Sequence, residues 1–141
     1  MAFEPSSTWG YGVPYDPPAA GLNRPSVELR RLLDEAGQPP WRIPVVATPA
    51  GRVVLLGMTP GTQTIPHHHP RAEETFQVIS GVVGLTIGDE PERLVRPGTL
   101  VLALRDVVHG IRIPGPEPAV LMCTVTPNED APDEQIDSPL S

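Results

Sequence analysis

The sequence predicts an all-β protein, a small barrel or sandwich of short antiparallel strands with one short helix and extended ends. Short runs rich in valine, isoleucine and leucine recur along the middle of the chain, and each is followed by a glycine or proline turn. In addition, 20 of the 141 residues are proline and 13 are glycine, which leaves little room for long helices. A chain of this length is about one domain with a single hydrophobic core.

The composition divides the chain into three parts. Residues 1–40 form an N-terminal extension, which starts as an irregular aromatic-rich segment and contains the one clear helix pattern, over residues 26–36. Ser26 can cap that helix, and a glycine ahead of two prolines ends it. Residues 41–126 hold the β runs of the barrel, and residues 127–141 form an acidic, proline-rich tail.

Nine short strands are expected between the extension and the tail. Because antiparallel strands joined by short turns pack as a sandwich or close as a barrel, this pattern sets the fold class. The expected strands are Ile43–Ala47, Val53–Met58, Gln63–His69, Thr75–Ser80, Val82–Ile87, Arg93–Val95, Leu100–Leu104, Gly110–Ile113 and Ala119–Thr126.

Charge and composition exclude several classes of protein. The net charge of −7 comes from the two ends, since the seven arginines and seven acidic residues of residues 41–126 cancel, so no basic face for nucleic acid is expected. All ten basic residues are arginine, which excludes a Schiff-base lysine mechanism. The single cysteine, Cys123, fits a reducing compartment. Without a secretory signal pattern or a membrane-spanning apolar run, a cytoplasmic protein with no membrane partner is expected.

One stretch, residues 61–81, gathers the residue types that bind metals. His67 and His69 stand two residues apart, and on a strand both side chains point to the same side. Glu74 opens the next apolar run and can face the same cavity. Two imidazoles and a carboxylate that converge form a divalent-metal site with nitrogen and oxygen ligands. A fourth ligand should come from elsewhere, and outside the three-histidine run the chain has only His109.

The spacing of these residues resembles the first motif of the cupin superfamily. That motif sets a glycine, two histidines, a glutamate and a second glycine at defined intervals. It is met in full by Gly61, His67, His69, Glu74 and Gly81.

The second cupin motif is met in part. Its Pro-Gly start is Pro97-Gly98, and its histidine is His109, eleven residues after that glycine. Leu104 and Asp106 stand where the family usually has proline and glycine. These departures concern the turn before the histidine and leave the ligand itself in place.

The resemblance covers roughly residues 42–126 and implies a cupin jelly-roll β-barrel, or double-stranded β-helix, that commonly forms a homodimer. It also implies one divalent transition metal per chain, either Fe, Mn, Ni, Co, Cu or Zn. The implied ligands are His67, His69, Glu74 and His109. Glu73 is an alternative carboxylate, but only Glu74 also satisfies the six-residue gap to the second glycine. His68 is expected to point away from the metal.

The metal is expected to lie in a mostly apolar cavity that binds a small molecule. Because side chains alternate along strands, Phe76 and Val78 should face the same side as Glu74, and Ile111 the same side as His109. The expected lining of the substrate pocket is Gln63, Phe76, Val78, Ile111 and Met122.

A three-histidine, one-glutamate metal centre has open coordination positions and suits a metal-dependent enzyme. Our first hypothesis is a dioxygenase similar to the quercetinase-like single-domain cupins, acting on an apolar or aromatic oxygenated substrate, with Glu74 as ligand and catalytic base. One alternative is a non-redox cupin enzyme, a polyketide cyclase or an isomerase. Another is a non-catalytic cupin that binds a metal or small ligand. Turnover at an open coordination position distinguishes the enzymes from the binding module.

Overall fold

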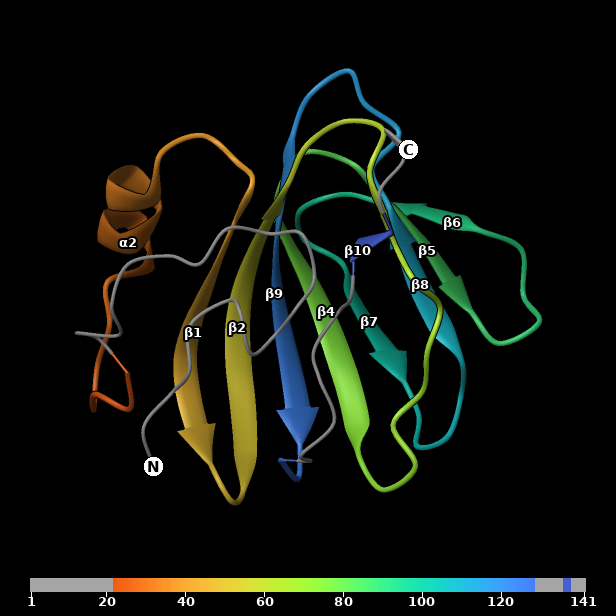
Figure 1. The fold of residues 1–141 in the computed structure, drawn as a ribbon, viewed down its shortest axis with the longest axis horizontal. Coiled ribbons are helices and arrows are strands. Elements are labelled where there is room, and N and C mark those ends of the chain that lie inside the picture. The colour runs from red at the N-terminus through yellow and green to blue at the C-terminus, as the bar shows by residue number, and fades with distance from the viewer. Residues whose placement is uncertain (1–21, 129–135, 138–141) are drawn as a thin grey trace.

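A computed structural model of the chain describes residues 22–128 and 136–137. Within them the strands form two five-stranded antiparallel sheets, in the orders β1-β2-β9-β4-β7 and β10-β3-β8-β5-β6 (Figure 1). The elements are α2 (Leu29–Ala36), β1 (Trp41–Thr48), β2 (Gly51–Met58), β3 (Gln63–Thr64), β4 (Glu73–Ser80), β5 (Val83–Ile87), β6 (Arg93–Val95), β7 (Leu100–Ala103), β8 (His109–Arg112), β9 (Ala119–Thr126) and β10 (Ile136–Asp137). Successive strands cross between the sheets as in a jelly roll, so the expected all-β fold class is confirmed.

The two sheets pack face to face over the main hydrophobic core. Burial alternates along β4 and β9, so that Phe76, Val78 and Leu121 are at most 2% exposed. From the second sheet, Leu85 of β5 and Ile111 of β8 close the same core. Each fully buried aliphatic or aromatic side chain contributes roughly 1.5–3 kcal/mol, so this contact holds the two sheets together.

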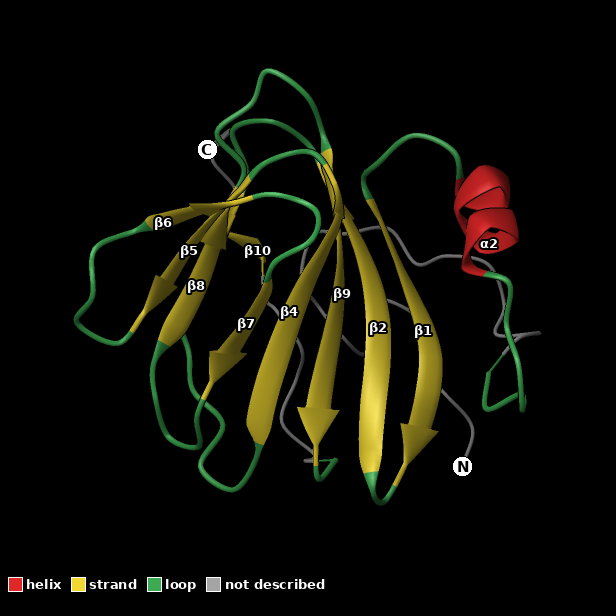
Figure 2. Ribbon diagram, turned by 180° about the vertical axis from the view of Figure 1, so that it is seen from behind, coloured by secondary structure: helices red, strands yellow, loops and turns green. Residues whose placement is uncertain are grey.

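The helix α2 packs against a second apolar cluster, outside the main core. Trp41 and Leu55 are the largest buried side chains of this cluster, which lies on the outer side of β1, β2 and β9. Figure 2 shows the helix beside β1, the edge strand of the β1-β2-β9-β4-β7 sheet. The indole N–H of Trp41 donates a hydrogen bond of 2.9 Å to the carbonyl oxygen of Gly37, just after the helix. This bond ties the end of the helix to β1.

The helix begins at Leu29, three residues later than expected from the sequence. Glu28 precedes it in extended backbone, with φ −81° and ψ 102°, and makes no side-chain capping bond. Ahead of it, the side chain of Asn23 donates to the carbonyl oxygen of Ala47 at 3.0 Å and accepts from the N–H of Ala47 at 2.7 Å. These bonds fix the entry to the helix against β1, in place of the cap expected from Ser26.

The strand expected over Gln63–His69 is interrupted. Only β3 pairs regularly, and Pro66 follows it with no N–H to donate to a ladder. The chain returns to the sheet at His67, in a single antiparallel bridge with His109. The other expected strands are present, with ends that shift by at most two residues, and β10 adds a short pairing with β3.

The two ends of the chain and its assembly with other molecules are not described by this structure. The aromatic-rich start of the N-terminal extension and most of the acidic tail lie outside the described residues. The division into residues 1–40, 41–126 and 127–141 therefore stays a prediction, as do the homodimer and the cytoplasmic location.

Gly57 of β2 makes room for the ring of Trp41. A Cβ atom at Gly57 would lie 2.7 Å from the nearest indole atom. We therefore expect Gly57→Ala to displace the ring and to lower the free energy of unfolding by about 1–3 kcal/mol, measured by urea denaturation. The matched control is Gly110→Ala on β8, where the Cβ would meet Pro66 at an ordinary 3.7 Å. Equal losses in the two variants would contradict this explanation.

An ion pair clamps the β5–β6 hairpin to β8, the strand that carries His109. The guanidinium of Arg112 donates two hydrogen bonds to the carboxylate of Glu92, at 2.8 and 2.7 Å. Glu92 crosses over Gly84, where a Cβ would lie 2.7 Å from a carboxylate oxygen. The hydrogen bonds from Arg112, and then its charge, lower the pKa of Glu92 below the ordinary 4.5, and the same contact raises the pKa of Arg112.

This clamp should make stability depend on pH in the acid range. Because the pKa of Glu92 is lower in the folded chain, the pair stabilises the fold above the ordinary carboxyl pKa, and its contribution is lost as the pH falls through the folded value. Glu92→Gln should lower the urea midpoint near neutral pH and leave it unchanged in strong acid. The effect should be small, since the side chains of Arg112 and Glu92 are 46% and 32% exposed. Glu90→Gln, which loses only a 3.9 Å contact with Arg93, is the control and should show no such pH dependence.

Candidate metal centre

Four side chains from separate parts of the chain meet inside the jelly roll. His67 and His69 come from the loop between β3 and β4, Glu74 from β4, and His109 from the first position of β8. One nitrogen or oxygen atom of each lies within 4.8 Å of the corresponding atoms of the other three. His69, Glu74 and His109 are at most 2% exposed, and His67 is half-buried. The fold therefore gathers the four residues that the cupin motifs pointed to.

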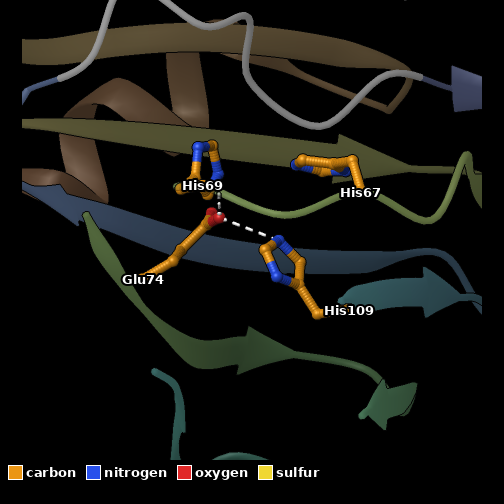
Figure 3. Close-up of side chains that lie close together, drawn as sticks. All are labelled: His67, His69, Glu74 and His109. Atoms are coloured by element: carbon orange, nitrogen blue, oxygen red, sulfur yellow. Dashed lines mark hydrogen bonds and ion pairs between the residues drawn. The ribbon is translucent and has the colours of Figure 1, made fainter. Parts of the chain in front are cut away.

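The carboxylate of Glu74 lies at the centre of this group. Its Oε1 atom is 2.9 Å from Nε2 of His69 and 3.0 Å from Nε2 of His109. Figure 3 shows the carboxylate between these two rings, with the ring of His67 alongside. The ring centroid of His67 lies 5.1 Å from that of His69 and 4.5 Å from that of His109.

Backbone carbonyl oxygens orient two of the imidazole rings. Nδ1 of His67 lies 3.0 Å from the carbonyl oxygen of Ile65, and Nδ1 of His109 lies 3.4 Å from that of Val107. A carbonyl oxygen can only accept, so these contacts favour the tautomer with hydrogen on Nδ1 and leave Nε2 as an electron-pair donor. Nε2 of His109 and Oε1 of Glu74 then face each other at 3.0 Å, each with a lone pair of electrons. Two lone pairs this close repel each other, and a cation bound to both atoms would remove the repulsion.

The donor set also fits a metal ion by distance. Two ligand atoms about 2.1 Å from one ion are roughly 3.0 Å apart when at right angles and roughly 4.2 Å apart when opposite. Oε1 of Glu74 lies 2.9 and 3.0 Å from the Nε2 atoms of His69 and His109, which matches the first case. All pairs of donor atoms lie within 4.8 Å, which is little more than the roughly 4.2 Å expected for opposite ligands. Side-chain movements of less than about 1 Å would therefore bring all four donor atoms to bonding distance of one ion. Imidazole nitrogens with a carboxylate suit a divalent transition metal.

Local backbone bonds place the two loop histidines. His67 and His109 exchange two bonds, from His67 N–H to His109 O at 3.0 Å and from His109 N–H to His67 O at 2.8 Å. The N–H of Asp106 donates to the carbonyl oxygen of His69 at 2.9 Å. His67 and His69 were expected to share one face of a strand, but these bonds to the loop before β8 bring the two rings together instead.

The other two candidates near the motif point away from the group. His68 is exposed and lies 3.6 Å from the carboxylate of Asp106, so it belongs to the surface. Glu73 is exposed, whereas Glu74, the next residue of β4, is 1% exposed and faces inward. Alternation along the strand thus distinguishes the two carboxylates in favour of Glu74.

Phe76, one of the five expected pocket residues, lies beside the metal group, and two others share its hydrophobic core. Phe76, Val78 and Ile111 are buried in the main core, and the ring centroid of Phe76 is 5.2 Å from that of His109. Phe76 packs edge-on to the ring of His109, which limits the orientations of that ligand.

Gln63 and Met122 do not face this interior. Gln63 is exposed, and it is the next residue, Thr64, that points inward and accepts a 2.8 Å hydrogen bond from the N–H of Ile111. Met122 packs with the outer cluster under α2, while its neighbour Cys123 belongs to the core. Met122 is thus one residue out of phase with the core, because adjacent side chains point to opposite faces. Gln63 lines an open surface pocket together with His109 and Ile111, so its role in a substrate pocket stays a prediction. The inward phase of β9 could be recognised only from its pairing, in which Cys123 lies opposite Phe76.

The fold and the site together define a jelly-roll protein with a histidine–glutamate group that could hold a metal. A family model described as the cupin domain matches residues 54–125. The chain therefore belongs to the cupin family.

Known proteins are similar to the chain over most of its length. The germin-like protein 5-1 of Oryza sativa subsp. japonica is 31% identical over 115 residues, which cover 77% of this chain and 49% of that protein. The chain thus spans about half the length of this curated relative. The solved structure of TT1209 from Thermus thermophilus has a TM-score of 0.66 and 25% identity, and the match covers 75% of this chain and 100% of the other.

A second solved structure supports the fold alone. It is an uncharacterised protein with a double-stranded β-helix domain from Klebsiella pneumoniae, with a TM-score of 0.63 and 24% identity, and the match covers 82% of this chain and 91% of the other. In the part of our chain that the structure describes, no helix has the length and apolar character needed to span a membrane.

Removing one ligand should remove the metal without unfolding the barrel. We expect His109→Ala and Glu74→Ala each to reduce the metal retained after dialysis by more than about tenfold, measured by elemental analysis, while circular dichroism stays that of the folded chain. The matched control is His68→Ala, because this exposed neighbour points to Asp106 and should leave retention unchanged. Retention at the wild-type level in both ligand variants would rule out this assignment.

Proposed function

We propose that this chain is a metal-dependent cupin enzyme of the dioxygenase type, which acts on a small apolar or aromatic molecule that bears oxygen. The observation that carries the proposal is the group of His67, His69, Glu74 and His109, whose donor atoms lie within 4.8 Å of one another among apolar side chains. Bound there, a divalent transition metal would supply Lewis acidity toward a substrate oxygen and, if redox-active, the means to react with dioxygen.

Glu74 is the group in this site best suited to move a proton. Its Oε1 atom lies between the rings of His69 and His109, 2.9 and 3.0 Å from their Nε2 atoms, so the two buried rings limit where the carboxylate can lie. A carboxylate held within hydrogen-bond reach of an enol or an acidic C–H group can act as a general base. We therefore assign to Glu74 the removal of a proton from the bound substrate.

The apolar surroundings serve the same reaction by excluding water. Phe76 is fully buried and packs edge-on to the ring of His109, in the same apolar core as Val78 and Ile111. In such surroundings the attraction between a developing negative charge and a nearby cation is much stronger than in water. Thr64 contributes by position alone, because its hydroxyl holds β3 to β8 beside the ligands.

A non-redox reaction, such as that of a polyketide cyclase or an isomerase, would use the same carboxylate as a base without dioxygen. A non-catalytic cupin would hold the metal or a small ligand without turnover. The identity of the metal separates these cases, since zinc has no redox chemistry, whereas Fe, Cu, Ni, Co and Mn can react with dioxygen.

The test is elemental analysis of protein purified without chelator or nickel resin, followed by oxygen-uptake assays with flavonols and other enols. We expect close to one redox-active metal per chain and oxygen consumption that depends on substrate. Glu74→Gln should lower the rate by at least about 100-fold in samples matched for metal content. Stoichiometric zinc would favour the cyclase or isomerase, and a chain that takes up no metal even on reconstitution would leave only the binding module.

A further inference from the structure

A groove of about 330 Å³ opens at the side of the jelly roll, between β7 and the β5–β6 hairpin. In Figure 1, β7 lies between β4 and the strands of the second sheet, and within the described chain it pairs with β4 alone. The apolar side chains that line the groove include Leu85, Ile87, Val101, Leu102, Leu104 and Val107. Such a volume lies at the lower end of the range for small-molecule sites, roughly 300–1,000 Å³.

The β7 side of this groove is apolar on both faces. Val101 and Ala103 point into the core, while Leu100, Leu102 and Leu104 point outward and are 66%, 46% and 54% exposed. The outer cluster under α2 covers β1, β2 and β9 and includes none of these leucines. Three exposed leucines at alternate positions of one strand edge form an apolar patch, and such patches mark surfaces that bind other molecules.

The groove also reaches the neighbourhood of the metal ligands. Ile87 is the cross-strand partner of His109, and the carbonyl oxygen of Val107 lies 3.4 Å from Nδ1 of that histidine. On the other wall, Val101 is the cross-strand partner of Phe76, whose ring packs on His109. The floor of the groove is thus one layer of side chains from the metal group.

The size of the exposed surface favours a small molecule over a second copy of the chain. Three half-exposed leucines offer roughly 150 Å² of apolar area, taking about 100 Å² for a whole leucine side chain. A pair of copies would bury about 300 Å² through them, well below the roughly 1,200 Å² of a stable interface. The charged residues of the groove, Glu90 and Arg93, face each other at 3.9 Å, so an uncharged ligand suits it best.

We propose that this groove holds the body of the substrate, an uncharged aromatic or hydrocarbon framework whose oxygen-bearing end reaches the metal centre past Val107 and Phe76. This inference rests on the proposed function for the role of the metal, but the groove itself can be tested separately. Leu102 and Leu104 would be specificity-determining residues, because they contact the framework and leave the metal ligands untouched.

The first experiment titrates the folded protein with 2-naphthol, a neutral aromatic molecule with one hydroxyl group, and follows its fluorescence. We expect Leu102→Asp to weaken binding by about tenfold, the effect of losing one well-packed apolar contact. Leu104→Gln is a second, milder variant that should act in the same direction. Leu94→Asp is the matched control, because Leu94 is a similarly exposed leucine, at 49%, on β6 and does not line the groove. Unchanged affinity in both groove variants would overturn the proposal.

The second experiment measures proton relaxation of 2-naphthol in the presence of the Mn²⁺-loaded protein. Faster relaxation that Leu102→Asp reduces would support a groove joined to the metal centre, and binding without faster relaxation would overturn that connection. Failure to take up Mn²⁺ or any other metal would count against the proposed function, and the titration would still decide the groove. Binding that weakens as protein concentration rises, with a doubling of mass in sedimentation, would show that a second copy covers the groove and would overturn the proposal.

Discussion

The contact between Glu74 and His109 joins the two sheets through their common core. Glu74 stands on β4 of one sheet and His109 on β8 of the other, and their side chains meet at 3.0 Å with each residue 1% exposed. A buried carboxylate is costly unless a cation or a hydrogen-bond donor compensates its charge, so the two sheets must keep a distance and register at which the two side chains can share a cation. His69 contacts the same carboxylate oxygen at 2.9 Å. The backbone bonds between His67 and His109 then position the loop that carries His67 and His69.

The two edges of the β1-β2-β9-β4-β7 sheet differ in how well they are covered. On one side α2 covers β1, β2 and β9 over a closed apolar cluster that includes Trp41. On the other side β7 is an edge strand whose outward leucines stay exposed beside an open groove. Strand edges and exposed apolar patches are where sheet proteins meet other molecules.

Sequence reasoning succeeded where a local pattern sufficed. The strand positions follow from apolar runs and turns, and the spacing of His67, His69, Glu74 and His109 identifies four side chains that the fold then gathers. It failed where one residue of strand phase mattered, at Met122, since neighbouring side chains take opposite faces and both faces of β9 are apolar.

The sequence by itself determined the fold class, the order of the strands and the residues of the metal group, because each depends on turn-forming residues or on spacing along the chain. Only the tertiary structure decided the start of the helix, the return of the chain to the sheet at His67 and the groove beside β7. The first depends on bonds between Asn23 and β1, the second on the bridge between His67 and His109. The groove depends on how far two strand edges stand apart. All three are set by contacts between residues distant in the chain, which no local pattern records.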